Sequence, residues 1–434
     1  MSRKPLTSLL LAAIAAVLPV RAQEELRLSL AEAQDHAIEY NRMLKNAGLA
    51  VDAAQEGVWA AAAMGLPQVD ATVDYTNFLG AEIEIRFGGE EAPATRIPFK
   101  PTSNLGLTVG QLIFSGNYIV GLQTAMIYKD LMESSYEKTE LDIKQQVASS
   151  YYTVLIAERT HEILVKNLEN IREVYDNTSA MYSVGMAEVT DVDQMAVQVT
   201  YLENAARSAE RQIELAYNLL RLQLGVEANT SIVLSDNMDE ILLRIDFDQT
   251  LAGEFSLEGN IDYRMMNTQE LLTKKQVDME RMSYLPTISG FYSRTEKILK
   301  PDFDMTPANL LGLQVNVPIF SSGARKSRVD QAKISYKTML NNKALLTDQL
   351  LIQEKQLRFN LRSGMEQFES QTENVAVSKR VYDNLNLKYQ QGLVSSLDLT
   401  TANNNYLQAE TGYTSALMQL LNAQLALDKL LNNL

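Results

Sequence analysis

Residues 182–194 read YSVGMAEVTDVDQ, and residues 389–401 read YQQGLVSSLDLTT. Each stretch begins with Tyr, has Gly three positions later, and has Asp six positions after that Gly. Each interrupts a long segment that otherwise contains few helix breakers. Gly is the preferred residue where a helix ends in the left-handed conformation, so both stretches predict a sharp reversal between two long helices.

The flanking segments have the composition of long helices. The 63 residues between Gly121 and Gly185 include neither Gly nor Pro and are rich in good helix formers. As one helix they would extend about 95 Å. Residues 186–224 and 29–64 form two further runs of helical character. Together these runs match the length of the long helix, which predicts an antiparallel hairpin extended by a collinear helix.

The two halves of the chain repeat one plan. Residues 41–67 align without a gap to residues 260–286, and LGLTVGQLIFSGN from Leu105 aligns with LGLQVNVPIFSSG from Leu311. We therefore predict a tandem duplication. The first repeat would cover residues 23–225 and the second residues 257–434. Each would contain a helix, two strands and a long helical hairpin, with an insertion at residues 226–256 between the repeats.

Four segments alternate between apolar and polar residues with the period of a strand. They are residues 69–75, 105–109 and 311–319, and the less regular TISGFYS after Pro286. Loops at residues 80–104 and 296–309 would join them in pairs. Four strands cannot close a membrane barrel, since the smallest closed barrels have eight. Lipid does not tolerate open sheet edges, so strands in a membrane would require several chains to share one barrel.

Composition excludes several classes of function. The first residues, MSRKPLTSLLLAAIAAVLPVRAQ, have the order of a secretory signal peptide, which predicts cleavage after residue 22 and export. There is no Cys, and the two His residues lie on separate helical segments, so we expect no metal and no cofactor. No phosphate loop or nucleophile elbow is present. The net charge of −15 argues against nucleic acid as a partner.

This layout resembles the TolC-like outer membrane efflux proteins. The resemblance rests on the repeat, the two reversals, the strand openings at Leu66-Pro67 and Leu285-Pro286, and the corners LIFSGN and PIFSSG. It implies an α+β membrane protein and a homotrimer. Each chain would give four strands to a 12-stranded outer membrane β-barrel, continued by a long periplasmic α-helical tunnel. The insertion and the end of the chain would form an equatorial collar around the tunnel.

The resemblance also implies a function. The chain would be the exit duct of a tripartite efflux or type I secretion system, which conducts substrates passively across the outer membrane. Its partners would be a periplasmic adaptor protein, an inner membrane transporter and outer membrane lipid. A soluble periplasmic coiled-coil scaffold is the alternative, because long helices alone would also fit it. An enzyme is a more distant alternative, because the sequence offers it no nucleophile, metal or cofactor.

The same resemblance assigns roles at the two reversals. It implies gate or aperture residues at Thr190 and Asp191 in the first tip, and at Tyr389 and Asp398 in the second. Three copies of Asp398 would form an acidic ring that attracts cations. Val394 stands where related proteins have a gate Arg, and Thr401 where they have a second acidic residue. Adaptor contacts would fall on six further tip residues, Val184, Gly185, Met186, Gln391, Gly392 and Leu393.

Simpler interpretations of these residues remain open. Asp191 with Gln194, and Ser395 with Asp398, have the spacing of a helix-capping box. Gly185 and Gly392 are suited to chain reversal whether or not a partner binds there. The aromatic residues near the strands would suit either interfacial belts on a barrel or ordinary strand packing; they are Tyr75, Phe78, Phe87, Phe99, Phe114, Phe291, Tyr292, Phe303 and Phe320.

Overall fold

The computed structural model describes residues 25–86, 93–300 and 306–434. The predicted signal peptide and the aromatic residues Phe87 and Phe303 lie outside these ranges. The chain divides into two compact units. The first contains the described residues up to Ala37 together with Ser150–Ile245, and the second contains Ile38–Ser149 and Asp246–Leu434. Among the described residues, no helix combines the length and the apolar character needed to cross a membrane.

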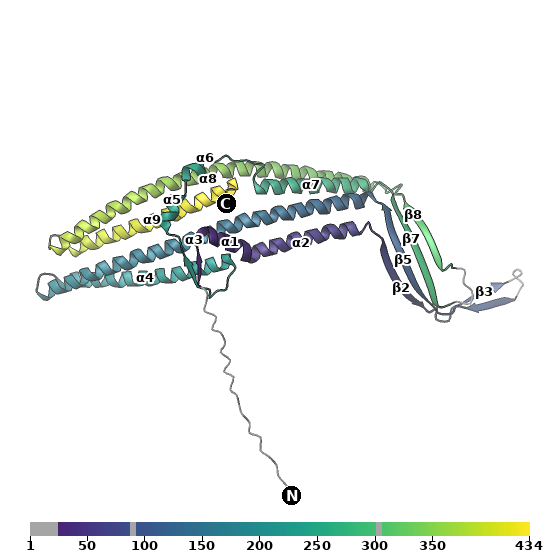
Figure 1. The fold of residues 1–434 in the computed structure, drawn as a ribbon, viewed down its shortest axis with the longest axis horizontal. Coiled ribbons are helices and arrows are strands. Elements are labelled where there is room, and N and C mark those ends of the chain that lie inside the picture. The colour runs from purple at the N-terminus through teal and green to yellow at the C-terminus, as the bar shows by residue number, and fades with distance from the viewer. Residues whose placement is uncertain (1–24, 87–92, 301–305) are drawn as a thin grey trace, which may run out of the picture. The chain divides into compact units, whose positions relative to one another are not determined.

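A four-stranded antiparallel sheet lies at one end of the second unit (Figure 1). Its strands are β2 (Gln68–Thr76), β5 (Thr102–Phe114), β7 (Thr287–Leu299) and β8 (Asn309–Asn316), in the order β2-β5-β7-β8. All four predicted strands are present, and the least regular one, after Pro286, forms one of the longest. The strand predicted for residues 311–319 stops early, at Asn316, because Pro318 has no N–H to donate to a neighbour.

The two faces of this sheet differ in chemistry. Thr287 pairs with Asn316, and Ser289 with Gln314, so these polar residues share one face. Ile288 pairs with Val315 on the opposite face, next to Leu313, which is 65% exposed. Where β7 and β8 meet the helices, one face is therefore polar and the other apolar; farther along, Phe291 and Leu310 lie on the polar side.

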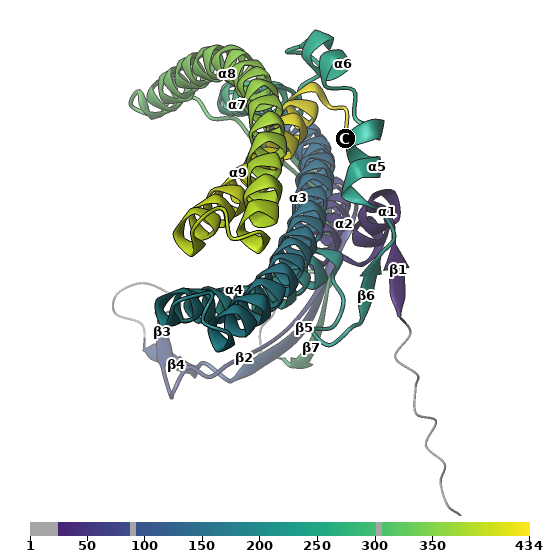
Figure 2. The same ribbon diagram turned by 90° about the vertical axis from the view of Figure 1, so that its left-hand side faces the viewer.

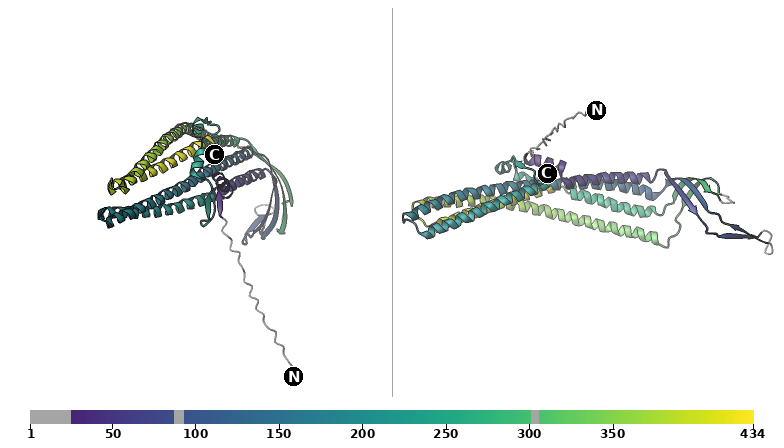
Figure 3. Two further views of the ribbon diagram at one scale, coloured as in Figure 1. Left: turned by 60° about the vertical axis from the view of Figure 1, so that its left-hand side comes forward. Right: turned by 90° about the horizontal axis from the view of Figure 1, so that it is seen from below.

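The predicted loop at residues 80–104 contains a hairpin that sequence analysis missed. β3 (Glu82–Arg86) pairs with β4 (Ala94–Pro98). Figure 3 shows this hairpin extending past the end of the four-stranded sheet. Ile83 lies opposite Ile97, and at the base of the hairpin the rings of Phe78 and Phe99 have centroids 5.2 Å apart. The Gly and Pro residues around these short strands conceal their period-two pattern.

The helical run predicted at residues 29–64 is two helices, α1 (Leu30–Tyr40) and α2 (Arg42–Ala63). Asn41 interrupts it because its backbone is extended and its side chain accepts hydrogen bonds from the N–H groups of Met43 and Leu44. Asn260 caps α7 (Ile261–Met282) in the same way. Side-chain capping competes with continuation of a helix, which explains the break.

Four helical segments adjoin the sheet: α2, the start of α3 (Gly116–Ser183), α7 and the start of α8 (Ala324–Gln390) (Figure 1). Polar contacts join neighbouring segments. Arg264 on α7 donates to Glu137 on α3 at 2.8 Å. Lys343 on α8 donates to Glu270 on α7 at 2.7 Å. The order of elements is the same in both halves, namely helix, two sheet strands, long helix and second helix.

Farther from the sheet, α8 pairs with α9 (Ser396–Leu431), as Figure 2 shows. The short helix α6 (Phe247–Ala252) packs against this pair through Phe247 and Leu251, which contact a core of Leu361, Leu420 and Leu427. Arg358 on α8 also donates to the carbonyl oxygens of Leu251 and Gly253. Part of the insertion predicted at residues 226–256 therefore packs against the second hairpin, which is formed by α8 and α9.

The first unit contains the end of α3, α4 (Val189–Leu224), α5 (Met238–Arg244), most of α1, and a parallel pair formed by β1 (Leu26–Leu28) and β6 (Ile232–Leu234). Its polar centre is the buried carboxylate of Asp236. This carboxylate accepts hydrogen bonds from Leu30 N–H at 2.7 Å, the Tyr151 hydroxyl at 3.1 Å and Arg244 at 2.9 Å. β1, β6 and this cluster were not predicted from the sequence.

Candidate functional site

The second predicted reversal joins α8 to α9. Gly392 has φ of +70°, and the Leu393 N–H reaches back to the Lys388 carbonyl at 2.9 Å. This is the pattern of a helix that ends in a left-handed Gly. Ser395 then caps α9, because its hydroxyl accepts from the Asp398 N–H at 3.2 Å. The structure confirms the reversal and the predicted capping box of Ser395 and Asp398.

The carboxylate of Asp398 completes this box and is exposed to solvent. It accepts hydrogen bonds from the Ser395 hydroxyl at 2.7 Å and from the Ser395 N–H at 3.2 Å. These two bonds hold the pKa of Asp398 below its usual value. The side chain is therefore ionised at neutral pH, so the tip of the second hairpin carries a fixed negative charge.

The first reversal, between α3 and α4, has the same backbone geometry. Gly185 has φ of +78°, and the Met186 N–H donates to the Met181 carbonyl at 2.9 Å. Its capping differs from the prediction, because Glu188, and not Asp191, is the capping residue. Asp191 instead accepts from the Glu188 N–H at 3.1 Å, and the Thr190 hydroxyl donates to the Glu188 carboxylate at 3.3 Å.

The two tyrosines that open the repeated motif occupy different environments. Tyr182 is 49% exposed, whereas Tyr389 is only 8% exposed. Both reversals also present large apolar side chains to solvent. Val184 is 71% exposed and Met186 is 73% exposed at the first, and Leu393 is 68% exposed at the second. Both reversals therefore place apolar side chains in contact with solvent.

The structure places the two departures from the family pattern beside the second reversal. Val394 is half-buried and has no polar group with which to form an ion pair. The Thr401 hydroxyl donates to the Leu397 carbonyl of its own helix at 2.8 Å. The described second tip therefore has one acidic side chain, Asp398. It lacks the Arg and the second acidic residue of the family pattern.

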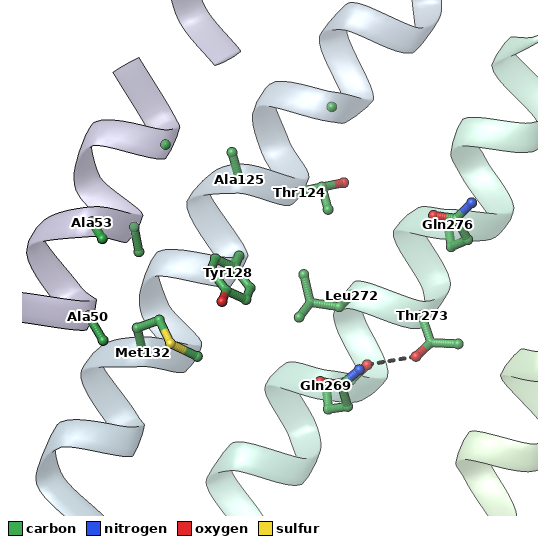
Figure 4. A pocket seen from close by; sticks show the side chains of 13 residues that line it. Ala50, Ala53, Thr124, Ala125, Tyr128, Met132, Gln269, Leu272, Thr273 and Gln276 are labelled. Carbon is green, nitrogen blue, oxygen red and sulfur yellow. Dashed lines mark hydrogen bonds between the residues drawn. The ribbon is translucent and has the colours of Figure 1, made fainter. Parts of the chain in front are cut away.

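An open groove of about 890 Å³ runs along α2, α3 and α7 (Figure 4). Small residues line its α2 side, and Tyr128, Met132 and Leu272 are its large apolar or aromatic side chains. Its lining contains no Asp, Glu, Lys or Arg. Across the described residues, no group of three or more His, Cys, Asp or Glu side chains is placed to hold a metal ion. The groove thus offers a smooth, uncharged surface without acid–base groups.

Comparison with known proteins identifies the family. The model described as "Outer membrane efflux protein" matches residues 33–226 and 256–433. The chain belongs to the outer membrane efflux protein family, whose members are channel proteins. It is therefore an efflux channel protein and not an enzyme, and the coiled-coil scaffold is not favoured.

Two curated relatives and two solved structures show the extent of the similarity. The chain is 23% identical over 402 residues to the toluene efflux pump outer membrane protein TtgC of Pseudomonas putida, and the match covers 90% of this chain and 80% of the relative. It is 21% identical over 314 residues to the outer membrane protein TolC of Vibrio cholerae, with coverage of 71% and 68%.

The fold matches that of VceC from Vibrio cholerae with a TM-score of 0.72, 15% identity and coverage of 93% and 95%. It matches the open state of the MtrE outer membrane channel from Neisseria gonorrhoeae with a TM-score of 0.73, 16% identity and coverage of 93% and 88%.

Proposed function

We propose that three copies of this chain form a 12-stranded β-barrel in the outer membrane, continued by a helical tunnel in the periplasm. The observation that carries this proposal is the four-stranded sheet, in which β2 and β8 are edge strands. Unpaired edges are unfavourable in lipid, and pairing β8 of one copy with β2 of the next removes them. Three copies supply twelve strands, enough to close a barrel.

This channel acts as the passive exit duct of a tripartite efflux or type I secretion system. An inner membrane transporter supplies the energy, and a periplasmic adaptor joins the transporter to the hairpin tips. The exposed Val184, Met186 and Leu393 support an apolar adaptor contact, to which Gly185, Gln391 and Gly392 contribute backbone. In this proposal residues 1–22 direct export and are cleaved, and residues 226–256 contribute to a collar around the tunnel.

The gate residues lie at the tips. Thr190 and Asp191 form hydrogen bonds within the first reversal. Asp398 places one charge per copy at the second, and three copies form an acidic ring that favours cations. Tyr389 is held within the second hairpin by burial. Because Val394 cannot form an ion pair, this gate does not close through a salt bridge at that position.

Single-channel recordings in planar bilayers test this function. The wild-type protein should insert and pass a small current that prefers cations. The variant Asp398→Asn should reduce the cation preference, whereas Asp348→Asn, which removes an exposed charge from the middle of α8, should leave it unchanged. The double variant Asp191→Ala, Tyr389→Phe should raise the conductance. Folded, inserted protein with the same ion selectivity in all variants would exclude the acidic ring.

A further inference from the structure

A small polar cavity of about 230 Å³ lies where the sheet of the second unit joins its helices. It is enclosed by the start of α3, the end of α7, the adjoining ends of β7 and β8, and the start of α8 (Figure 1). This volume is large enough for several water molecules. Among the described residues, no Asp or Glu lines it. The polar lining residues are Ser115, Asn117, Ser283, Thr287, Asn316 and Arg325.

Arg325 provides the positive charge of this cavity and is held in place by two contacts. Its Nη1 donates to the Pro318 carbonyl at 2.9 Å, and its guanidinium lies 5.9 Å from the centre of the Tyr284 ring. Within the described residues no carboxylate pairs with Arg325. A guanidinium has five N–H donors, so most of its donor capacity is available to a ligand.

The first turn of α3 adds further donors. The Ser115 hydroxyl accepts from the Tyr118 N–H at 3.3 Å, whereas the N–H groups of Gly116 and Asn117 belong to a turn that has no acceptor within the helix. A Cβ on Gly116 would lie 2.9 Å from Met282 Cβ, so Gly allows this turn to approach α7 closely. The start of a long helix also carries partial positive charge, which favours an anion.

The cavity opens on the polar face of the sheet. Thr287 and Asn316 line it, and they share that face with Ser289 and Gln314. The apolar face, which carries Val315 and Leu313, is on the other side. In a membrane barrel the apolar face contacts lipid and the polar face contacts water. A ligand that reaches this cavity therefore comes from the aqueous interior.

We propose that this cavity, which we call the corner cavity, binds a small oxyanion: the phosphate or carboxylate group of a water-soluble molecule. Arg325 supplies a charge-assisted hydrogen bond, and the α3 N-terminus, Asn117 and the hydroxyl groups complete the shell. This binding site goes beyond the proposed function. Only the statement that its ligand comes from the aqueous interior rests on the proposed barrel. Three copies would place three such sites around the channel, close to the membrane.

Inorganic phosphate is a suitable probe, and its phosphorus NMR line width reports binding to the purified full-length protein in detergent. Arg325→Gln removes the charge that faces the cavity. Arg328→Gln is the matched control, because Arg328 lies three residues later on the same helix, is exposed and does not line the cavity. Asn117→Asp is the second test variant. It adds a carboxylate to the lining that contains Arg325, which should compete with an external anion without changing Arg325 or Pro318.

We expect the wild type and Arg328→Gln to bind phosphate equally, and Arg325→Gln to bind about tenfold or more weakly, as expected for loss of a charged hydrogen bond. Asn117→Asp should also lose binding while remaining folded. If the phosphate line broadened equally with all four proteins, or did not broaden with the wild type, the proposed oxyanion site would be wrong. Displacement of phosphate by phosphatidylglycerol but not by glycerol phosphate would overturn its assignment to the aqueous side. The assay does not require conduction, so it is independent of the channel proposal.

Discussion

Replacing Asp428 with Asn tests how α6 is fastened to the second hairpin. Asp428 lies on α9, is 8% exposed and accepts a hydrogen bond from Gln424. Burial raises its pKa to about 6, although hydrogen bonds from Thr250 and Gln424 act in the opposite direction. Nearby cations are engaged elsewhere, since Lys429 pairs with Asp142 and Arg358 with Glu354. Among the residues that the structure describes, this carboxylate therefore has no cationic partner, and at neutral pH it is a buried charge.

The sign of the pH dependence follows from this shift. The pKa in the folded protein is raised above the unfolded value of 3.8, so folding favours the protonated form. The resulting stability is fully present below about pH 4 and is lost as the pH rises through about 6. A shift of about two units corresponds to at most about 3 kcal/mol. Solvent near the carboxylate screens part of this, so we expect about 1–2 kcal/mol.

The amide introduced by Asp428→Asn would carry no charge and could donate to the Gln424 Oε1, which is buried without a hydrogen-bond partner. At about pH 8, α6 and the end of α9 should therefore be better protected from hydrogen exchange in the variant than in the wild type. At about pH 4 the two proteins should be protected equally. Comparison at equal pH cancels the intrinsic exchange rates. Asp348→Asn, at an exposed position on α8, is the control and should change nothing. A difference in protection that does not depend on pH, or lower protection in Asp428→Asn at high pH, would show that the Asp428 charge does not destabilise this region.

Three further changes test other contacts. Asp236→Asn should weaken the first unit by about 2–4 kcal/mol, because it disrupts a buried charged network. Burial raises the pKa of the Asp236 carboxyl, but hydrogen bonds from Leu30, Arg244 and Tyr151 outweigh burial and lower it. The stability that the Asp236 carboxylate contributes should therefore be lost as the pH falls below about 4. Hydrogen exchange of β1 and β6 measures it, and an unchanged exchange rate would contradict it. Gly392→Ala should destabilise the second reversal by about 1–2 kcal/mol, because its φ is positive; Gly57→Ala, inside α2, is the control and should not. Asn260→Ala should cost α7 about 1 kcal/mol through loss of its cap, seen as faster exchange in the first turn of α7.

The parts of the fold that follow one-dimensional patterns were predictable from the sequence. The period-two segments became the four sheet strands, and the Gly residues at positions 185 and 392 became left-handed helix ends. Asn41 was overlooked because a single capping residue inside an otherwise helical run changes neither composition nor period. The β3–β4 hairpin was missed because Gly and Pro residues surround its two short strands and conceal their period.

The features that depend on three-dimensional proximity could not be predicted. The motif that begins at Tyr182 recurs at Tyr389, but one ring is exposed and the other buried, because packing around each hairpin differs. The corner cavity combines Asn117, Ser283 and Arg325 from three distant segments. Each of these residues is ordinary in its own sequence context, so only the fold indicates that they act together.

Native mass spectrometry of the intact protein, extracted from outer membranes, determines whether three copies complete one barrel. We expect a complex of three chains that persists after mild detergent extraction. A stable single chain in the outer membrane, or any copy number that does not supply twelve strands, would contradict it.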